Sequence, residues 1–217
     1  TNFETPDELA VCGRYFRGGF DEVLTGDKAT VATWNEKASG ARYIHFAALG
    51  PSMNGGFQLH DGPLSLDQIR NTPVHAEMVV ITARATPEQQ MRRARAFLDA
   101  GARWVLVAGW EVPDKVRVKY LANIYDSMNQ ERPPVRALSE GRNKLFNDSL
   151  MGIDLDDPAL WGVFTLFGKP STVWTRRRNT TARGRSISSV TGSPRAGNSI
   201  LAKTLPFQKI KFLSISF

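Results

Sequence analysis

Nearly continuous apolar runs alternate with helical patterns along the first 170 residues of the chain. Three runs, at residues 42–49, 76–83 and 103–110, each contain a single charged residue, at or next to the start. Such runs are typical of strands that are covered on both faces. Shorter apolar stretches at 20–26 and in the last part of 156–168 predict two further strands.

Helix start signals precede several of the segments between these runs. A Ser or Thr that is followed three residues later by Glu or Gln predicts a helix start, and Pro at the first helical position strengthens it. Cap residues predict helices that begin at Thr5, Asp27, Ser65 and Thr86, and Glu8 and Gln89 complete two capping boxes. The second of these helices should end near Gly40. Helical spacing predicts two more helices, over 114–128 and 133–148, and a turn is predicted at 61–63.

The helix after Thr86 contains both apolar and strongly basic positions. Four apolar residues recur at helical spacing and are predicted to face the sheet, namely Met91, Ala94, Phe97 and Leu98. The same helix contains Arg92, Arg93 and Arg95. We interpret these arginines as a solvated face, with a partner-binding patch as the alternative.

Strands that alternate with helices over such short connections predict an α/β fold with a mostly parallel central sheet between helices. In such sheets, functional side chains gather at the carboxyl ends of the strands. Three pairs of residues occupy these ends, namely Leu49–Gly50, Arg84–Ala85 and Gly109–Trp110. We therefore expect a functional site where these strand ends meet.

The positive charge of the chain is concentrated near its C-terminal end. The formal net charge is +7, yet residues 1–168 contain all 21 acidic residues and only 18 of the 28 Lys and Arg residues. From residue 171 the sequence is rich in Ser, Thr, Gly and Arg and lacks periodicity, although its last stretch, at 200–217, is apolar. We expect one domain over residues 1–170 and a basic, low-complexity, disordered tail over residues 171–217.

Several classes of protein receive no support from the sequence. Cys12 is the single cysteine and cannot form an internal disulfide, and the three histidines lack zinc-site spacing. No apolar run reaches the roughly 20 residues of a membrane span, and no signal peptide is recognised. We expect a cytoplasmic protein without metal or cofactor. Because the chain does not begin with Met, we expect a fragment or a processed piece.

The order of these segments resembles the CHAT domain, a caspase-like cysteine peptidase family that is often attached to tetratricopeptide repeats. The pieces that carry the resemblance are LTGDKAT, YIHFAALG, VVITARAT, AFLDAGARWVLVAGWEVPD and DDPALWGVFTLFGKP. Each piece is weak alone, but the ordered series covers roughly residues 6–170. The resemblance implies a caspase-like three-layer sandwich.

The resemblance also assigns the two catalytic positions of the family. The first family strand ends like His-x-Ala-x-His-Gly, and its second His is the general base. Here HFAALG keeps His45, Ala47 and Gly50 but has Leu49 at the base position. The second strand ends like Ser-Ala-Cys, and Arg84 stands at the position of this nucleophilic Cys. The resemblance thus implies that both members of the dyad are substituted.

Amide hydrolysis by this route needs a thiolate that attacks the carbonyl and an imidazole that transfers protons. Leucine transfers no proton, and arginine, with a pKa above about 12, is neither nucleophile nor base near neutral pH. We therefore expect a catalytically degenerate domain that acts in protein binding, scaffolding or regulation. By resemblance, its partners would be tetratricopeptide-repeat modules, an active sister peptidase or a peptide retained in the cleft.

Five residues are candidates for contacts with a peptide or partner, namely His45, Gly50, Arg84, Thr86 and Trp110. His45 lies about 13 Å of strand rise from the base position and is interpreted as a hydrogen-bonded core histidine. Arg84 could hold a ligand carboxylate in bidentate fashion or pair with an acid of the domain, and the sequence leaves both open. Thr86 is also the expected helix cap.

Two alternative functions remain open at the level of the sequence. Cys12 is interpreted as a small buried residue, but an active cysteine peptidase with Cys12 near a histidine would also fit the family. The arginines of the tail could bind nucleic acid or an anionic membrane through phosphate contacts. The tail could equally be foreign to the domain, because the resemblance stops near Pro170.

Overall fold

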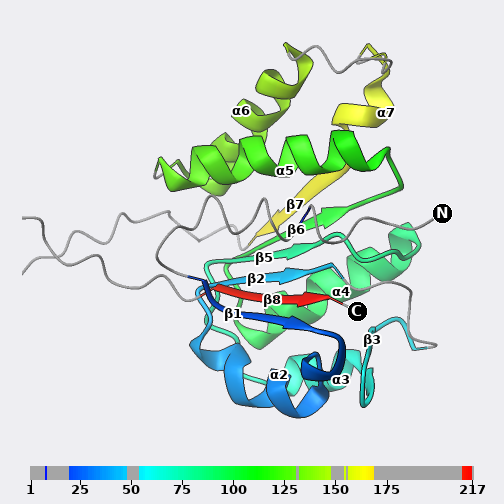
Figure 1. Cartoon of the computed structure of the whole chain (residues 1–217), viewed down its shortest axis with the longest axis vertical. Coiled ribbons are helices and arrows are strands. Elements are labelled where there is room, and N and C mark those ends of the chain that lie inside the picture. The colour runs from blue at the N-terminus through cyan, green and yellow to red at the C-terminus, as the bar shows by residue number, and fades with distance from the viewer. Residues whose placement is uncertain are drawn as a thin grey trace, which may run out of the picture.

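The computed structural model describes residue 8 and residues 20–47, 54–130, 132–147, 154, 156–168 and 212–216. For residues 20–22, 212–214 and 216 it describes the backbone only. Within these ranges the chain forms a six-stranded sheet with helices on both faces (Figure 1).

The strands of the sheet are β1 (Phe20–Thr25), β2 (Tyr43–Phe46), β5 (Met78–Ile81), β6 (Trp104–Ala108), β7 (Phe164–Gly168) and β8 (Phe212–Ser216). Their order across the sheet is β1-β8-β2-β5-β6-β7. Neighbouring strands are parallel except at one edge, where β7 runs antiparallel to β6. The strands β3 (Phe57–Leu59) and β4 (Gly62–Leu64) form a separate antiparallel hairpin. The mostly parallel α/β fold predicted from the sequence is confirmed.

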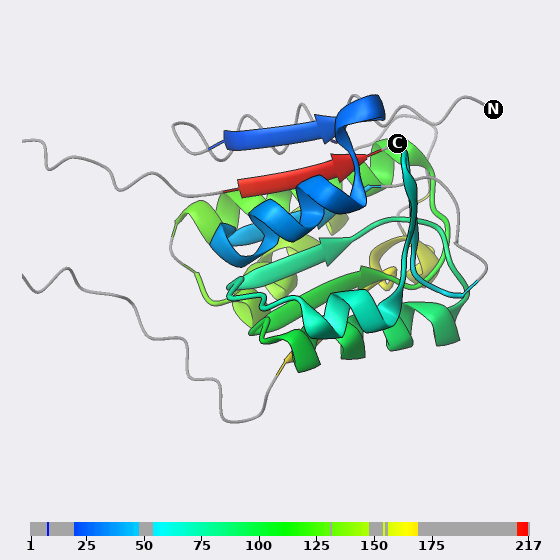
Figure 2. The ribbon, with the colours of Figure 1, turned by 90° about the horizontal axis from the view of Figure 1, so that it is seen from below.

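The helices are α2 (Val31–Lys37), α3 (Leu66–Asn71), α4 (Pro87–Ala100), α5 (Asp114–Asn129), α6 (Pro134–Phe146) and α7 (Pro158–Trp161). They cover both faces of the sheet and give three layers (Figures 1 and 2). On the face of α2, α3 and α4, the core includes Trp34, Phe46 and Phe97. On the face of α5, α6 and α7, a second core includes Tyr120 and Leu121.

Two helix starts follow the cap chemistry that the sequence predicts. The hydroxyl of Thr86 accepts a hydrogen bond from the backbone N–H of Gln89 at 3.3 Å, and the Gln89 side chain accepts one from the N–H of Thr86 at 3.0 Å. Ser65 caps α3 in the same reciprocal way with Gln68. Each box satisfies backbone donors that a helix start otherwise leaves free.

Three local predictions are wrong. The cap of α2 is Thr30 and not Asp27, because a separate 3-10 turn forms first, at Gly26–Lys28. The strand predicted over 42–49 is shorter, since β2 ends at Phe46. Met91 was expected to face the sheet, but it is 60% exposed.

Five residues of the segment expected to be a disordered tail form β8, inside the sheet between β1 and β2. Ile215 in this strand is fully buried. The remainder of 171–217 lies outside the described residues, and for it the disordered tail stays a prediction.

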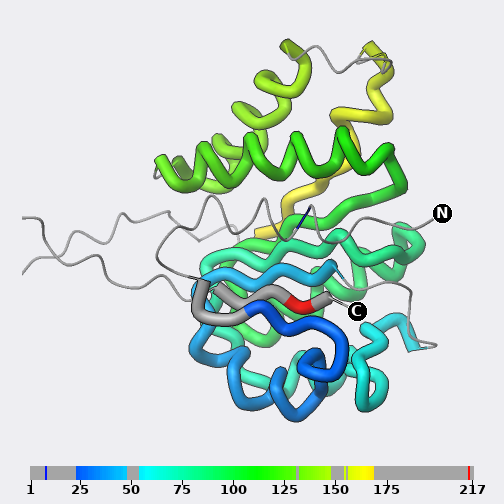
Figure 3. The backbone as a smooth tube through the Cα atoms, in the orientation of Figure 1, coloured from blue at the N-terminus to red at the C-terminus, as the bar shows by residue number. Residues whose placement is uncertain are grey.

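The chain passes from β1 through α2 to β2, then through the hairpin and α3 to β5, and through α4 to β6 (Figure 3). Because β2, β5 and β6 are parallel, their carboxyl ends meet at one edge of the sheet. In the described part of the chain, no helix combines the length and the apolar character that crossing a membrane requires.

Candidate functional site

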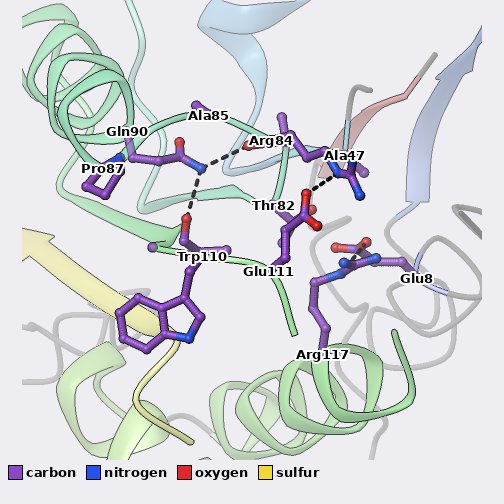
Figure 4. Close-up of a pocket in the computed structure, with 13 residues that line it drawn as sticks. Glu8, Ala47, Thr82, Arg84, Ala85, Pro87, Gln90, Trp110, Glu111 and Arg117 are labelled. Carbon is purple, nitrogen blue, oxygen red and sulfur yellow. Dashed lines mark hydrogen bonds and ion pairs between the residues drawn. The ribbon is translucent and has the colours of Figure 1, made fainter. Parts of the chain in front are cut away.

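A pocket of about 240 Å³ lies at the carboxyl ends of β2, β5 and β6 (Figure 4). Its walls are Ala47 after β2, residues 82–85 after β5 and residues 109–111 after β6. Ala108 at the end of β6, Pro87 and Gln90 on α4, Arg117 on α5 and Glu8 complete it. The pocket therefore occupies the sheet edge at which the sequence predicts a site.

Arg84 and Glu111 form an ion pair at this pocket, joining the segments that follow β5 and β6 (Figure 4). The two side chains are 42% and 62% exposed. Of the two alternatives left by the sequence, Arg84 thus pairs with an acid of the domain. Exposed pairs of this kind contribute about 1 kcal/mol or less, so a ligand can open this one at small cost.

His45 lies in the core beneath the pocket, with 0% of its surface exposed. Its Nε2 is 3.0 Å from Oε1 of Glu8 and 3.2 Å from Oγ1 of Thr82, and its Nδ1 is 3.2 Å from the hydroxyl of Tyr125. Because an ionised carboxylate only accepts hydrogen bonds, Nε2 carries a proton. Both ring nitrogens have partners, as expected for a core histidine.

Glu8 is buried, with a hydrogen bond on one carboxylate oxygen and an ion pair on the other. Oε1 faces His45, and Oε2 lies 3.3 Å from Nε of Arg117. Arg117 also pairs with Asp114 at 2.7 Å. Burial alone raises the pKa of Glu8, but the hydrogen bond and charge of His45, the charge of Arg117 and the nearby hydroxyl of Thr82 together lower that pKa below its ordinary value. Glu8 is therefore an anion in the floor of the pocket.

Gln90 links the ends of two strands under the pocket. Its side-chain amide donates to the carbonyl oxygens of Ala83 and Ala108, at 2.9 Å each (Figure 4). These carbonyls belong to the segments that end β5 and β6. One buried amide on α4 thus fixes the distance between two walls of the pocket.

Arg93 is also a buried link, and the interpretation of this residue as part of a solvated face is wrong. Its Nε and one terminal nitrogen donate to the carbonyl oxygens of Gly55 and Gly56, at 3.0 and 2.6 Å. The other terminal nitrogen donates to the carbonyls of Ala83 and Arg84, at 3.2 and 3.3 Å. Arg93 therefore ties the glycine segment that leads into β3 to the segment that ends β5.

The guanidinium of Arg93 lies 4.4 Å from the centre of the Phe57 ring. Burial lowers the pKa of Arg93 to about 10, so the side chain stays protonated near neutral pH. A sequence signal for its burial exists, because Gln90 three residues before it and Phe97 four residues after it lie on the same buried face of α4.

The remaining candidate residues are only partly described. Leu49, Gly50 and Cys12 lie outside the described residues, so the substitution at the base position stays a prediction. Thr86 caps α4 and is exposed. The pocket brings Trp110 together with Arg84, and the indole is half-exposed there.

The described lining of the pocket contains neither cysteine nor histidine. Nor do three His, Cys, Asp or Glu side chains converge on a possible metal position anywhere in the ranges that the structure covers. The exposed groups of the described lining are the Arg84 guanidinium, the Glu111 carboxylate and the Trp110 indole. The Thr82 hydroxyl, the Gln90 amide, Glu8 and Arg117 also line the pocket, but these side chains are largely or fully buried.

Comparison with known families agrees with this architecture. The model of the CHAT domain matches residues 3–169, which is most of the chain and includes every described element except β8. No curated protein matches the sequence. The chain belongs to the CHAT domain family, whose fold is caspase-like.

Proposed function

We propose that this CHAT domain binds a peptide or protein segment in its pocket without cleaving it, and so acts in scaffolding or regulation. The observation that carries the proposal is the ion pair between Arg84 and Glu111. By resemblance, position 84 is that of the family nucleophile. A guanidinium held there by a carboxylate cannot attack a carbonyl carbon.

Other described residues at the pocket do not replace the missing chemistry. Thr82 carries the one hydroxyl of the described lining, and it donates to the carbonyl of Phe46 at 3.3 Å. Its neighbour His45 is bonded to Glu8 and Tyr125 and has no exposed surface. A general base must reach the proton that it abstracts in a substrate complex, and His45 is enclosed below the floor.

The same groups are suited to binding. Trp110 is 47% exposed, and its Nε1 donates to the carbonyl of Ala159 at 2.8 Å, which fixes the orientation of the indole. An oriented aromatic face beside Arg84 and Glu111 resembles the centre of many protein interfaces, where aromatic residues and arginine dominate. By family resemblance, the bound segment would belong to a tetratricopeptide-repeat module or to an active sister peptidase.

The test compares binding and cleavage of the same peptides. An immobilised peptide array is probed with the native chain, and the peptides that bind are then incubated with it and analysed for cleavage by mass spectrometry. We expect binding without cleavage. Arg84→Glu should weaken binding at least tenfold, and the double variant Arg84→Glu, Glu111→Arg should still bind weakly because the charges are exchanged within the pocket.

A matched control is the pair Arg95 and Asp99, an exposed ion pair at 3.1 Å on α4 that does not line the pocket. The variant Arg95→Glu should bind like the native chain. Equal binding by Arg84→Glu and Arg95→Glu would overturn the assignment of the pocket as the binding site.

The active-peptidase alternative has a distinct outcome in the same experiment. Cleavage of bound peptides that is lost in Cys12→Ala, together with labelling of Cys12 by an activity-based thiol probe, would replace the proposal by a cysteine peptidase.

A polyanion-binding role of the basic segment is a second candidate, favoured by the absence of any acidic residue after 168. Replacement of five arginines by Gln removes charge and leaves β8 intact, namely Arg176, Arg177, Arg178, Arg183 and Arg185. Retention on heparin that falls with salt, and that this variant loses, would support the role. Equal retention would remove it.

A further inference from the structure

The strand β8 occupies a position between two strands that are themselves consecutive along the chain. β1 and β2 are joined by α2, yet they do not pair with each other, and β8 lies between them and is parallel to both (Figure 1). A strand in the middle of a sheet makes two ladders of hydrogen bonds and not one. β8 thus connects β1 to the rest of the sheet through its hydrogen bonds.

Without β8, the remaining fold would contain a gap of one strand. Strands in a sheet are about 4.8 Å apart, so β1 and β2 are about 10 Å apart and cannot form hydrogen bonds directly. Among the described residues, β8 is the sole ladder partner of β1. The described strands that flank this gap would then expose two unpaired edges, which is a template for a further strand.

The packing of Ile215 shows what kind of segment the gap accepts. Ile215 is in register with Leu24 on one side and with Phe46 on the other. All three residues are at most 2% exposed and belong to the core that contains Trp34. The gap therefore requires an extended segment with an apolar side chain at this position.

The chain between β7 and β8 is long, so it places little restriction on where the strand that fills the gap comes from. Gly168 is paired with Trp104 and Phe212 with Tyr43, so both ends of the connection lie at the amino edge of the parallel strands. They are four strand spacings apart, or about 19 Å. The 43 intervening residues, 169–211, could span about 140 Å when extended. The family match also ends at the first residue of this connection, residue 169.

From these observations we propose that the gap between β1 and β2 is a site that binds an added β-strand. Phe212–Ser216 occupies this site, stays bound when the chain that leads to it is cut, and can be replaced by another strand. This mode of binding is the addition of a parallel β-strand to a sheet, with backbone bonds for affinity and a side-chain position for specificity. The inference does not depend on the proposed function of the pocket.

The strand in the gap also contacts a residue of the pocket wall. The backbone N–H of Ala47 donates to the carbonyl of Ile215 at 2.9 Å, and Ala47 lines the pocket. The bound strand thus fixes the backbone at the end of β2, next to the segment in which the family places its general base.

The experiment uses the full chain with a protease recognition sequence inserted after Gly192. After cleavage, the C-terminal piece is expected to co-elute with the body in gel filtration under native conditions. A fluorescent peptide of residues 206–217, added in excess, should then displace it over time and become bound. The same peptide with Ile215→Asp should not bind, whereas Ile215→Val should bind with only a few-fold loss.

A second measurement serves if the cut protein aggregates. In the uncut chain, Ile215→Asp should lower the melting temperature by about 10 °C and Ile215→Val by only a few degrees. Separation of the C-terminal piece while the body keeps its melting temperature would overturn the proposal. So would equal binding of the native and Ile215→Asp peptides, or equal melting of the two variants. None of these readouts depends on peptide binding in the pocket.

Discussion

Nε2 of His45 lies 3.0 Å from Oε1 of Glu8, and both side chains are buried. The contact joins a residue near the start of the chain to the central strand β2. Arg117 on the facing helix α5 completes the arrangement at 3.3 Å from Glu8. The floor of the pocket is therefore a buried cluster of charged and polar groups whose hydrogen bonds depend on one carboxylate.

Glu8→Gln removes the negative charge of this cluster and keeps the shape of the side chain. Arg117 then loses a buried counter-ion, and the single oxygen of the amide can accept from either His45 or Arg117 but not from both. Breaking a buried pair in this way costs about 3 kcal/mol. We expect a decrease of this size in the free energy of unfolding, measured by urea denaturation. Glu36→Gln is the control, since Glu36 is exposed, and its effect should stay within about 0.5 kcal/mol.

The lowered pKa of Glu8 predicts the pH dependence of stability. Between this lowered pKa and the ordinary glutamate value of 4.5, the unfolded chain binds more protons at Glu8 than the folded chain does. The contribution of Glu8 is thus present above pH 4.5 and is lost as the pH falls through the folded pKa. Urea denaturation from pH 6 to pH 3 should show a shallower decline in Glu8→Gln than in the native chain; parallel declines would contradict the assignment.

Arg93→Met should be strongly destabilising, although an apolar side chain replaces a charge in the core. The carbonyls of Gly55 and Gly56 would lose their donors, and each unpaired buried acceptor costs about 1 to 3 kcal/mol. We expect a loss of about 3 kcal/mol in urea denaturation and faster hydrogen exchange in residues 54–59. Arg92→Met changes an exposed neighbour and should be nearly neutral. Similar effects of the two variants would show that the buried bonds contribute little.

Gly101→Ala tests the end of α4. Gly101 has φ of +115°, and a Cβ there would lie 2.6 Å from the carbonyl oxygen of Val74. Gly26 also has positive φ, at +54°, but no atom lies within 4 Å of its Cβ position. Gly26→Ala should cost about 1 kcal/mol from the backbone conformation alone, and Gly101→Ala clearly more because of the added clash. Thermal denaturation of both variants gives the comparison.

The sequence predicts those features that depend on neighbours along the chain. The caps at Ser65 and Thr86 are examples, because each capping box is contained in four residues. Thr30 was missed as a cap because Asp27, three residues earlier, is an equally good cap residue, and the chain uses it in a 3-10 turn. Local chemistry identifies the candidates and tertiary packing selects among them.

The partners of the buried polar links could not be predicted in this way. His45 was expected to be satisfied in the core, but its partners Glu8 and Tyr125 are 37 and 80 residues away in the sequence. Arg93 looked like its exposed neighbours because arginine is rarely buried, and only the backbone carbonyls that surround it make its burial possible. The position of β8 likewise depends on a gap that exists only in the folded sheet.

At Gly141 the helices α5 and α6 approach so closely that an added Cβ would lie 2.7 Å from Cγ1 of Ile124. Helices in such contact cannot slide or rotate past each other without first separating. α5 also carries Arg117 at the pocket and Tyr125 against His45. The two helices therefore form one rigidly packed unit. A displacement of α6 would also displace the residues of α5 that lie at the pocket and against His45.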